Sequence, residues 1–125
     1  MTAATFALAS FLAAANVVRV TFSRLCAGRC GTLYADRATL LTLFGGRGGY
    51  GDGEKVTEEW YFETPDGPVG VWDYWYNAPG EWSIAGSPEA CAAFVALFDG
   101  VEGVRAAMNG RERARVNLAA LGFNV

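Results

Sequence analysis

The stretch that decides the fold is EKVTEEWYFETPDGPVGVWDYWYNAPGEWSIAG, residues 54–86. It is rich in aromatic and β-branched residues, which favour extended strands. Two groups of turn-forming residues, TPDGP at 64–68 and NAPG at 77–80, divide it into three strand patterns. The stretch therefore predicts an antiparallel meander of strands joined by short turns.

The first turn sets the predicted register. Pro65 and Asp66 suit the centre of a type I turn, and Gly67 can adopt a positive φ as a bulge residue. Counting back from this three-residue loop pairs Trp60 with Trp72. The inward face would consist of Val56, Trp60, Phe62, Trp72, Tyr74 and Tyr76, and the half-exposed face of Glu59, Tyr61, Glu63, Asp73 and Trp75.

The second turn leaves the next strand, EWSIAG at 81–86, with two registers. A tight turn places Trp82 and Ile84 on the face of Trp75. One extra loop residue moves them to the face of Tyr74. The pattern predicts a strand here but does not decide which side chains face the core.

Helices are expected around this sheet. The segment 87–100 has Ser87 as N-cap, Pro88 at the first helical position and Gly100 as its stop. The other expected elements are helices at 36–44, 4–15 and 109–121 and a strand at 17–22. We therefore predict one α+β domain, residues 1–125, in which a three- or four-stranded antiparallel meander packs against three to four helices.

Composition excludes several classes of protein. The chain has 125 residues, of which 52% are hydrophobic and 18% charged, and its net charge is −3. These values disfavour a disordered segment and a strongly basic nucleic-acid-binding module. The chain has no histidine, which removes Ser-His-Asp and Cys-His catalysis and His-containing zinc sites. No set of residues supplies a catalytic, metal or cofactor site, so we predict a protein that is not an enzyme.

The chain has three cysteines, Cys26, Cys30 and Cys91. The sequence does not decide whether they form a disulfide or remain free thiols. A Cys26–Cys30 disulfide would require an oxidising compartment, whereas the odd number and the lack of a clear export signal favour free thiols in the cytoplasm. Cys91 is interpreted as a core thiol rather than a nucleophile. The apolar segment 1–16 is too short to span a bilayer and is interpreted as a core helix, with a cleaved signal as the alternative.

The glycine-rich segment GGRGGYGDG, residues 45–53, has three interpretations. A phosphate loop requires Lys and Ser/Thr after its last glycine, but Asp52 and Glu54 stand there instead. A single RGG is a weak signal for RNA binding. We therefore interpret the segment as a flexible connector between a helix and a strand.

Two groups of side chains are candidate binding sites. The predicted register places Glu59 opposite Asp73. Such a pair could share a proton, although two solvated, ionised carboxylates are the simpler interpretation without a pocket. The first site, for a partner with a basic surface, consists of Glu59, Tyr61, Glu63, Asp73 and Trp75. The second, for an anion or an acidic partner, consists of Arg111, Arg113 and Arg115, which could also be a solvated helix start.

Two short motifs carry a resemblance. VWDY at 71–74 is followed by WSIAG at 82–86 and then by a helix pattern. This order resembles small uncharacterised proteins encoded by bacteriophages, in which a VTIYDWK-like strand precedes a WHIGG-like strand and a helix. The sequence departs from that pattern at Trp75, Ser83 and Ala85. The resemblance covers a little under half of the chain and implies a phage or mobile-element origin, without an activity.

The sequence thus favours a non-enzymatic binding protein. We expect an accessory factor of a phage or mobile element that engages or inhibits a host protein through the acidic, aromatic sheet face. Its expected location is the cytoplasm of the bacterial host, without a membrane partner, and its oligomeric state is open. The alternative is a small nucleic-acid-binding module that uses the Arg111–Arg115 cluster, which the acidic central strands and the net charge disfavour.

Overall fold

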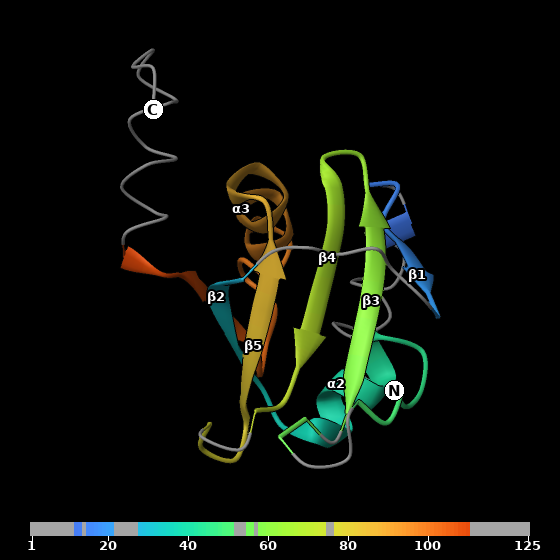
Figure 1. The fold of residues 1–125 in the computed structure, drawn as a ribbon, viewed down its shortest axis with the longest axis vertical. Helices are drawn as coiled ribbons and strands as arrows, with labels where there is room; N and C mark the ends of the chain where they lie inside the picture. Colours follow the sequence, from blue (N-terminus) through green and yellow to red (C-terminus); the bar gives the residue numbers. More distant parts are fainter. Residues whose placement is uncertain are drawn as a thin grey trace.

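Six strands form one antiparallel sheet in this computed structural model, which describes residues 12–13, 15–21, 28–51, 55–56, 58–74 and 77–110 (Figure 1). The elements are β1 (Val18–Val20), β2 (Arg29–Tyr34), α2 (Arg37–Leu43), β3 (Glu59–Thr64), β4 (Gly67–Trp72), β5 (Glu81–Gly86), α3 (Pro88–Ala96) and β6 (Arg105–Met108). The order of strands across the sheet is β1-β3-β4-β5-β2-β6, and every neighbouring pair is antiparallel.

The predicted meander is only the centre of this sheet. β3, β4 and β5 pair in chain order, but β1 adds to β3, and β2 and β6 add beyond β5. The prediction of a three- or four-stranded meander packed against three to four helices is therefore wrong. The described residues form a six-stranded sheet with two helices, α2 and α3, and the α+β, antiparallel character is confirmed. The helices predicted at 4–15 and 109–121 fall mainly outside the described residues.

β2 is not among the elements that the sequence predicts. Its Gly31 breaks the strand pattern, and the structure shows why a glycine stands there. A Cβ on Gly31 would lie 2.7 Å from the carbonyl oxygen of Ala107 in β6 and 3.3 Å from the Sγ of Cys91 in α3. The glycine therefore lets β6 and α3 approach β2 closely.

The first hairpin turn is one residue shorter than predicted. Thr64 pairs with Gly67, which leaves Pro65 and Asp66 as the two central residues. The Thr64 hydroxyl accepts a hydrogen bond from the Asp66 N–H at 3.1 Å and donates one to the carbonyl oxygen of Gly67 at 2.8 Å. These two bonds hold the tight turn, and Gly67 has the expected positive φ of 120°.

This shift of one residue changes the side of the sheet on which Trp72 lies. Trp60 pairs with Val71 rather than Trp72, and Glu59 pairs with Trp72 rather than Asp73. Successive side chains of a strand alternate between faces, so the shift moves Trp72 away from the core. The predicted inward position of Trp72 is therefore wrong, because Val71 is fully buried in its place.

The core lies between one face of the sheet and the two helices. In Figure 1, α3 lies behind the sheet and α2 lies at its lower end. The sheet contributes Leu33, Trp60, Phe62, Val69, Val71, Trp82 and Ile84, and the helices contribute Leu40, Leu43, Ala90, Cys91 and Phe94. Phe44 follows α2 and packs edge-on against Trp60 and Phe62, with ring centroids 5.3 and 4.9 Å apart. Trp82 is inward, which settles the register that the sequence left open.

A disulfide joins β2 to α3. Cys30 bonds to Cys91, with 6.4 Å between their Cα atoms, which is within the ordinary range. The prediction of free thiols is therefore wrong for these two residues, and Cys26 lies outside the described residues. The predicted start of the helix is confirmed, since the Ser87 hydroxyl accepts a hydrogen bond from the Ala90 N–H.

Candidate functional site

Three of the predicted site residues lie together on β3. Glu59, Tyr61 and Glu63 alternate with the buried Trp60 and Phe62, so they project from the sheet face opposite the helices. Val18 in β1 pairs with Glu63, and Trp72 in β4 pairs with Glu59. We call this surface, made of Val18, Glu59, Tyr61, Glu63 and Trp72, the β3 face.

Of the other predicted site residues, Asp73 lies in the described part of the chain and does not join the β3 face. Asp73 follows β4, where its carboxylate accepts a hydrogen bond from the N–H of Glu58 at 2.9 Å. Since Glu59 pairs with Trp72, the predicted opposed pair of Glu59 and Asp73 is wrong. Trp75 and the cluster Arg111, Arg113 and Arg115 lie outside the described residues.

Tyr61 and Glu59 form the polar centre of the β3 face. The Tyr61 hydroxyl donates a hydrogen bond to the Oε2 atom of Glu59 at 2.8 Å. Partial burial raises the pKa of Tyr61 to about 12, and the hydrogen bond and negative charge of Glu59 add to this shift. Tyr61 therefore stays neutral throughout the physiological range. A cavity of about 210 Å³ opens beside the pair, lined also by Arg19, Arg47, Gly48 and Gly49.

The raised pKa of Tyr61 predicts a specific pH dependence of stability. Below pH 10, near the pKa of an unfolded tyrosine, both states hold the proton and the contribution is fully present. Between pH 10 and about 12 the unfolded chain loses the proton first, so the free energy of unfolding falls as the pH rises. Urea unfolding at several pH values should show a weaker decline for Tyr61→Phe, and the 295 nm absorbance difference between the two proteins should titrate near pH 12. A midpoint near pH 10 in the folded protein would contradict the burial of this hydroxyl.

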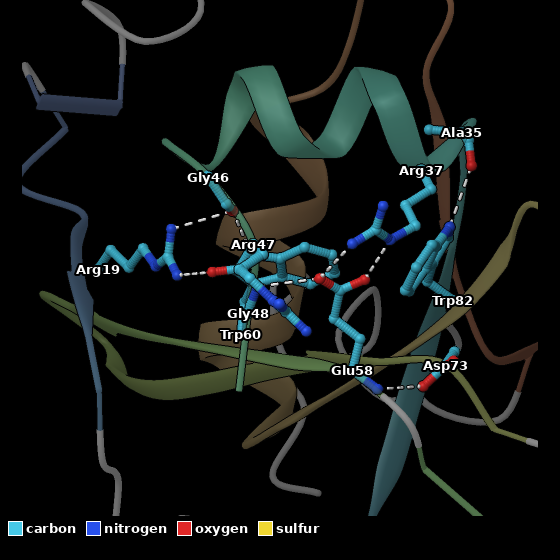
Figure 2. Close-up of polar contacts among 10 residues, drawn as sticks. All are labelled: Arg19, Ala35, Arg37, Gly46, Arg47, Gly48, Glu58, Trp60, Asp73 and Trp82. Carbon is cyan, nitrogen blue, oxygen red and sulfur yellow. Dashed lines mark hydrogen bonds and ion pairs between the residues drawn. The ribbon is translucent and has the colours of Figure 1, made fainter. Parts of the chain in front are cut away.

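A buried carboxylate that the sequence did not single out lies next to the β3 face. Only 7% of Glu58 is exposed. Its carboxylate accepts hydrogen bonds from Arg37 Nε at 2.6 Å and Nη2 at 3.2 Å, and from the N–H of Gly48 at 3.1 Å (Figure 2). The hydrogen bond and charge of Glu58 raise the pKa of Arg37. Glu58 thus ties the first turn of α2 to the glycine-rich loop.

Three side chains, those of Glu58, Trp60 and Arg19, form hydrogen bonds to the backbone of the described part of the glycine-rich segment, residues 45–51. Besides the bond to Glu58, the indole N–H of Trp60 donates to the carbonyl oxygen of Gly46 at 3.0 Å. The Arg19 guanidinium donates to the carbonyl oxygen of Phe44 at 2.7 Å. It also donates to the carbonyl oxygens of Gly46, at 3.1 Å, and of Arg47 (Figure 2). These residues connect α2 to β3, as the sequence predicts, and the hydrogen bonds fasten them to both. The Gly48 N–H, which a phosphate cradle would offer to a ligand, bonds to the carboxylate of Glu58.

Two adjacent glycines in this loop provide a matched pair of variants. A Cβ at position 48 would lie 2.2 Å from the carbonyl oxygen of Glu59, whereas a Cβ at position 49 has its nearest neighbour at 3.6 Å. We expect Gly48→Ala to lower the free energy of unfolding by about 1–3 kcal/mol, because the loop must move off β3. Gly49→Ala should change it by about 0.5 kcal/mol or less. Urea denaturation of both variants measures the difference, and equal effects would show that the loop does not pack against β3 as described.

No known protein family matches this sequence, and neither a curated protein nor a solved structure is significantly similar to it. Within the described ranges, no group of three or more His, Cys, Asp or Glu side chains could hold a metal ion. In the same part of the chain, no helix has the length and apolar character needed to cross a membrane. The site must therefore be interpreted from its own geometry.

Proposed function

We propose that this chain is a non-enzymatic binding protein that engages a partner protein through the β3 face. The observation that carries the proposal is the combination of acidic and large apolar side chains around Tyr61, which are exposed at Val18 and Glu63 and half-buried at the other positions. Half-buried aromatic rings supply contact energy in protein interfaces, and carboxylates at the rim steer a basic partner. The preferred partner surface is therefore basic.

The charges around β3 support this choice of partner. The Glu63 side chain is exposed and, within the described part of the chain, its carboxylate has neither an ion pair nor a hydrogen bond. Arg19, on the neighbouring strand, pairs with the buried Phe62, so its side chain lies on the helix side of the sheet and bonds to loop carbonyls. Its charge is thereby directed toward the loop, where Arg19 lines the cavity beside Glu59 and Tyr61. Val18, with 58% of its surface exposed, adds an apolar contact beside Glu63.

The biological setting is part of the proposal. The resemblance to phage-encoded proteins supports an accessory factor that engages or inhibits a host protein, and the predicted location is the cytoplasm of the bacterial host. The Cys30–Cys91 bond weighs against that location, because disulfides persist mainly in oxidising compartments. Alkylation of free thiols in intact cells before lysis shows whether Cys30 and Cys91 are bonded to each other in the cell. The result decides between the cytoplasm and an oxidising compartment. The nucleic-acid-binding alternative rests on Arg111, Arg113 and Arg115 and stays a prediction.

The test begins with capture of a partner from host lysate by the tagged full chain, followed by purification of that partner. Its affinity for the wild type should then be compared with that for Trp72→Ala, Glu63→Gln and Glu89→Gln. Trp72→Ala should weaken binding by about tenfold or more, because a half-buried aromatic anchor is lost. Glu63→Gln should mainly slow association, with a reduced salt dependence, and the distant control Glu89→Gln should leave binding unchanged. Equal affinity of all four proteins would overturn the proposal.

A further inference from the structure

β6 is an edge strand with outward-facing backbone groups. It pairs only with β2 among the described residues. The N–H of Asn109 donates to the carbonyl oxygen of Cys30 at 2.8 Å, so Asn109 faces β2. Backbone groups of alternate residues in an antiparallel strand point to the same side. Ala107 and Arg105 therefore also face β2, while the N–H and C=O groups of Ala106 and Met108 face outward, where the described residues offer no partner. An edge of this kind is a template for a further strand.

An apolar groove lies beside this edge. A cavity of about 630 Å³ is lined by the end of α3, the loop that follows it and the start of β6. Ala106 and Met108 pair with Leu33 and Gly31, which places their side chains on the helix side of the sheet. Of the apolar residues that line the groove, Phe98 is buried, whereas Val95, Val101, Val104 and Ala106 are only partly buried at the margin of the core. Among the described residues, no element covers this margin of the core beyond β6.

The rim of the groove is acidic. Asp99 and Glu102 are exposed there and make no ion pair within the described ranges. Arg105 also borders the groove, but its guanidinium lies 4.4 Å from the ring centroid of Tyr34. Tyr34 pairs with Arg105 and alternates with the inward Leu33, so this contact lies on the opposite side of the sheet. The charge presented to an occupant therefore comes mainly from two carboxylates.

We propose that the groove between α3 and β6 binds an extended peptide segment of another protein, which adds a seventh strand beside β6. The outward N–H and C=O groups of Ala106 and Met108 hydrogen-bond its backbone. Apolar side chains at alternate positions of the segment enter the groove, and basic side chains meet Asp99 and Glu102. This surface lies at the opposite end of the sheet from the β3 face, so the inference goes beyond the proposed function.

The other edge of the sheet lacks these features. β1 has three residues, against four in β6. The residue of β1 on the helix side is Arg19, whose guanidinium is bonded to carbonyl oxygens of the loop after α2. An added strand there would meet a polar side chain rather than an apolar groove. Strand addition is therefore expected at β6.

The test uses two blocked, fluorescein-labelled peptides, VKVKVKV and VEVEVEV, with the full chain. Fluorescence anisotropy should show saturable binding of the lysine peptide and binding weaker by about tenfold or more for the glutamate peptide. The double variant Asp99→Asn/Glu102→Gln should weaken binding of the lysine peptide by about fivefold or more, whereas Glu89→Gln and Glu63→Gln should leave it unchanged. Amide hydrogen exchange at Ala106 and Met108 should be fast in the free protein and should slow by about tenfold or more with saturating lysine peptide.

A backbone variant tests strand addition directly. Ala106→Pro removes an N–H that faces outward, and proline is tolerated at such edge positions. It should abolish peptide binding while the circular dichroism spectrum and thermal transition remain close to those of the wild type. If the variant unfolds, strand addition is tested instead by amide exchange at Ala106 and Met108 in the wild type, which should slow when the lysine peptide binds. No saturable binding of the lysine peptide, slow exchange of both amides in the free protein, or a dimer that Ala106→Pro dissociates would each overturn the proposal.

Discussion

Trp60→Ala is expected to lower the free energy of unfolding by about 3–5 kcal/mol, a large share of the about 5–15 kcal/mol that stabilises a typical domain. Only 1% of Trp60 is exposed. Its ring packs edge-on against Phe44 and Trp82, with centroids 5.3 Å away in both cases. The substitution removes these contacts, leaves a cavity between sheet and helix, and removes one of the two donors to the carbonyl oxygen of Gly46.

The matched control for this prediction is Trp72→Ala. Trp72 lies one position along β4 from Val71, the partner of Trp60, but on the opposite face, where it is half-buried. Trp72→Ala should lower the free energy of unfolding by about 1–2 kcal/mol. Urea denaturation followed by circular dichroism measures both values. An effect of Trp72→Ala as large as that of Trp60→Ala would indicate the three-residue turn that the sequence predicted, in which both rings are inward, and would contradict the observed register.

Reduction of the Cys30–Cys91 disulfide is expected to lower the free energy of unfolding by about 4 kcal/mol. The two residues are 61 positions apart, and a cross-link over that length restricts the unfolded chain by about this amount in the chain-entropy model. Both residues are buried, at 3% and 0% exposure, so the folded state holds them together without solvent access. The corresponding decrease in Tm is about 10–20 °C for a chain of this size.

Differential scanning calorimetry with and without a phosphine reductant measures this effect. The double variant Cys30→Ala/Cys91→Ala should melt near the reduced wild type and should not respond to reductant, whereas Cys26→Ala should behave like the wild type. A thiol assay of the denatured, oxidised chain should detect one free thiol, that of Cys26. An unchanged Tm of the wild type under reducing conditions would contradict the bond.

The elements that could be predicted are those with strong local signals. Ser87 and Pro88 begin α3 where the sequence places a helix, and the turn residues at 64–68 join two strands. The register was wrong because the Thr64 hydroxyl closes a two-residue turn, and a hydroxyl hydrogen bond of this kind is not visible in a pattern of apolar residues. β6 was not predicted because RAAM is short and carries neither aromatic nor β-branched residues.

The candidate site could be predicted only in part, for a related reason. Alternation along β3 correctly grouped Glu59, Tyr61 and Glu63, because period two depends on neighbours in the chain. Glu58 stands beside Glu59 and looks equivalent in the sequence. Its role depends on Arg37, which is 21 positions away and reaches it only through the packing of α2. An ion pair between residues distant in the sequence carries no local signal.

The strand order has a consequence for how the chain acquires its structure. β1 and β2 come first in the sequence, yet β1 pairs with β3, and β2 pairs with β5 and β6. Contacts between residues far apart in sequence form slowly, because a long loop must close before they contribute. We expect the β3–β5 hairpins to form first, as pulse-labelled amide exchange during refolding can establish. During synthesis, β1 and β2 can therefore complete their pairing only after residue 108, the end of β6, has left the ribosome.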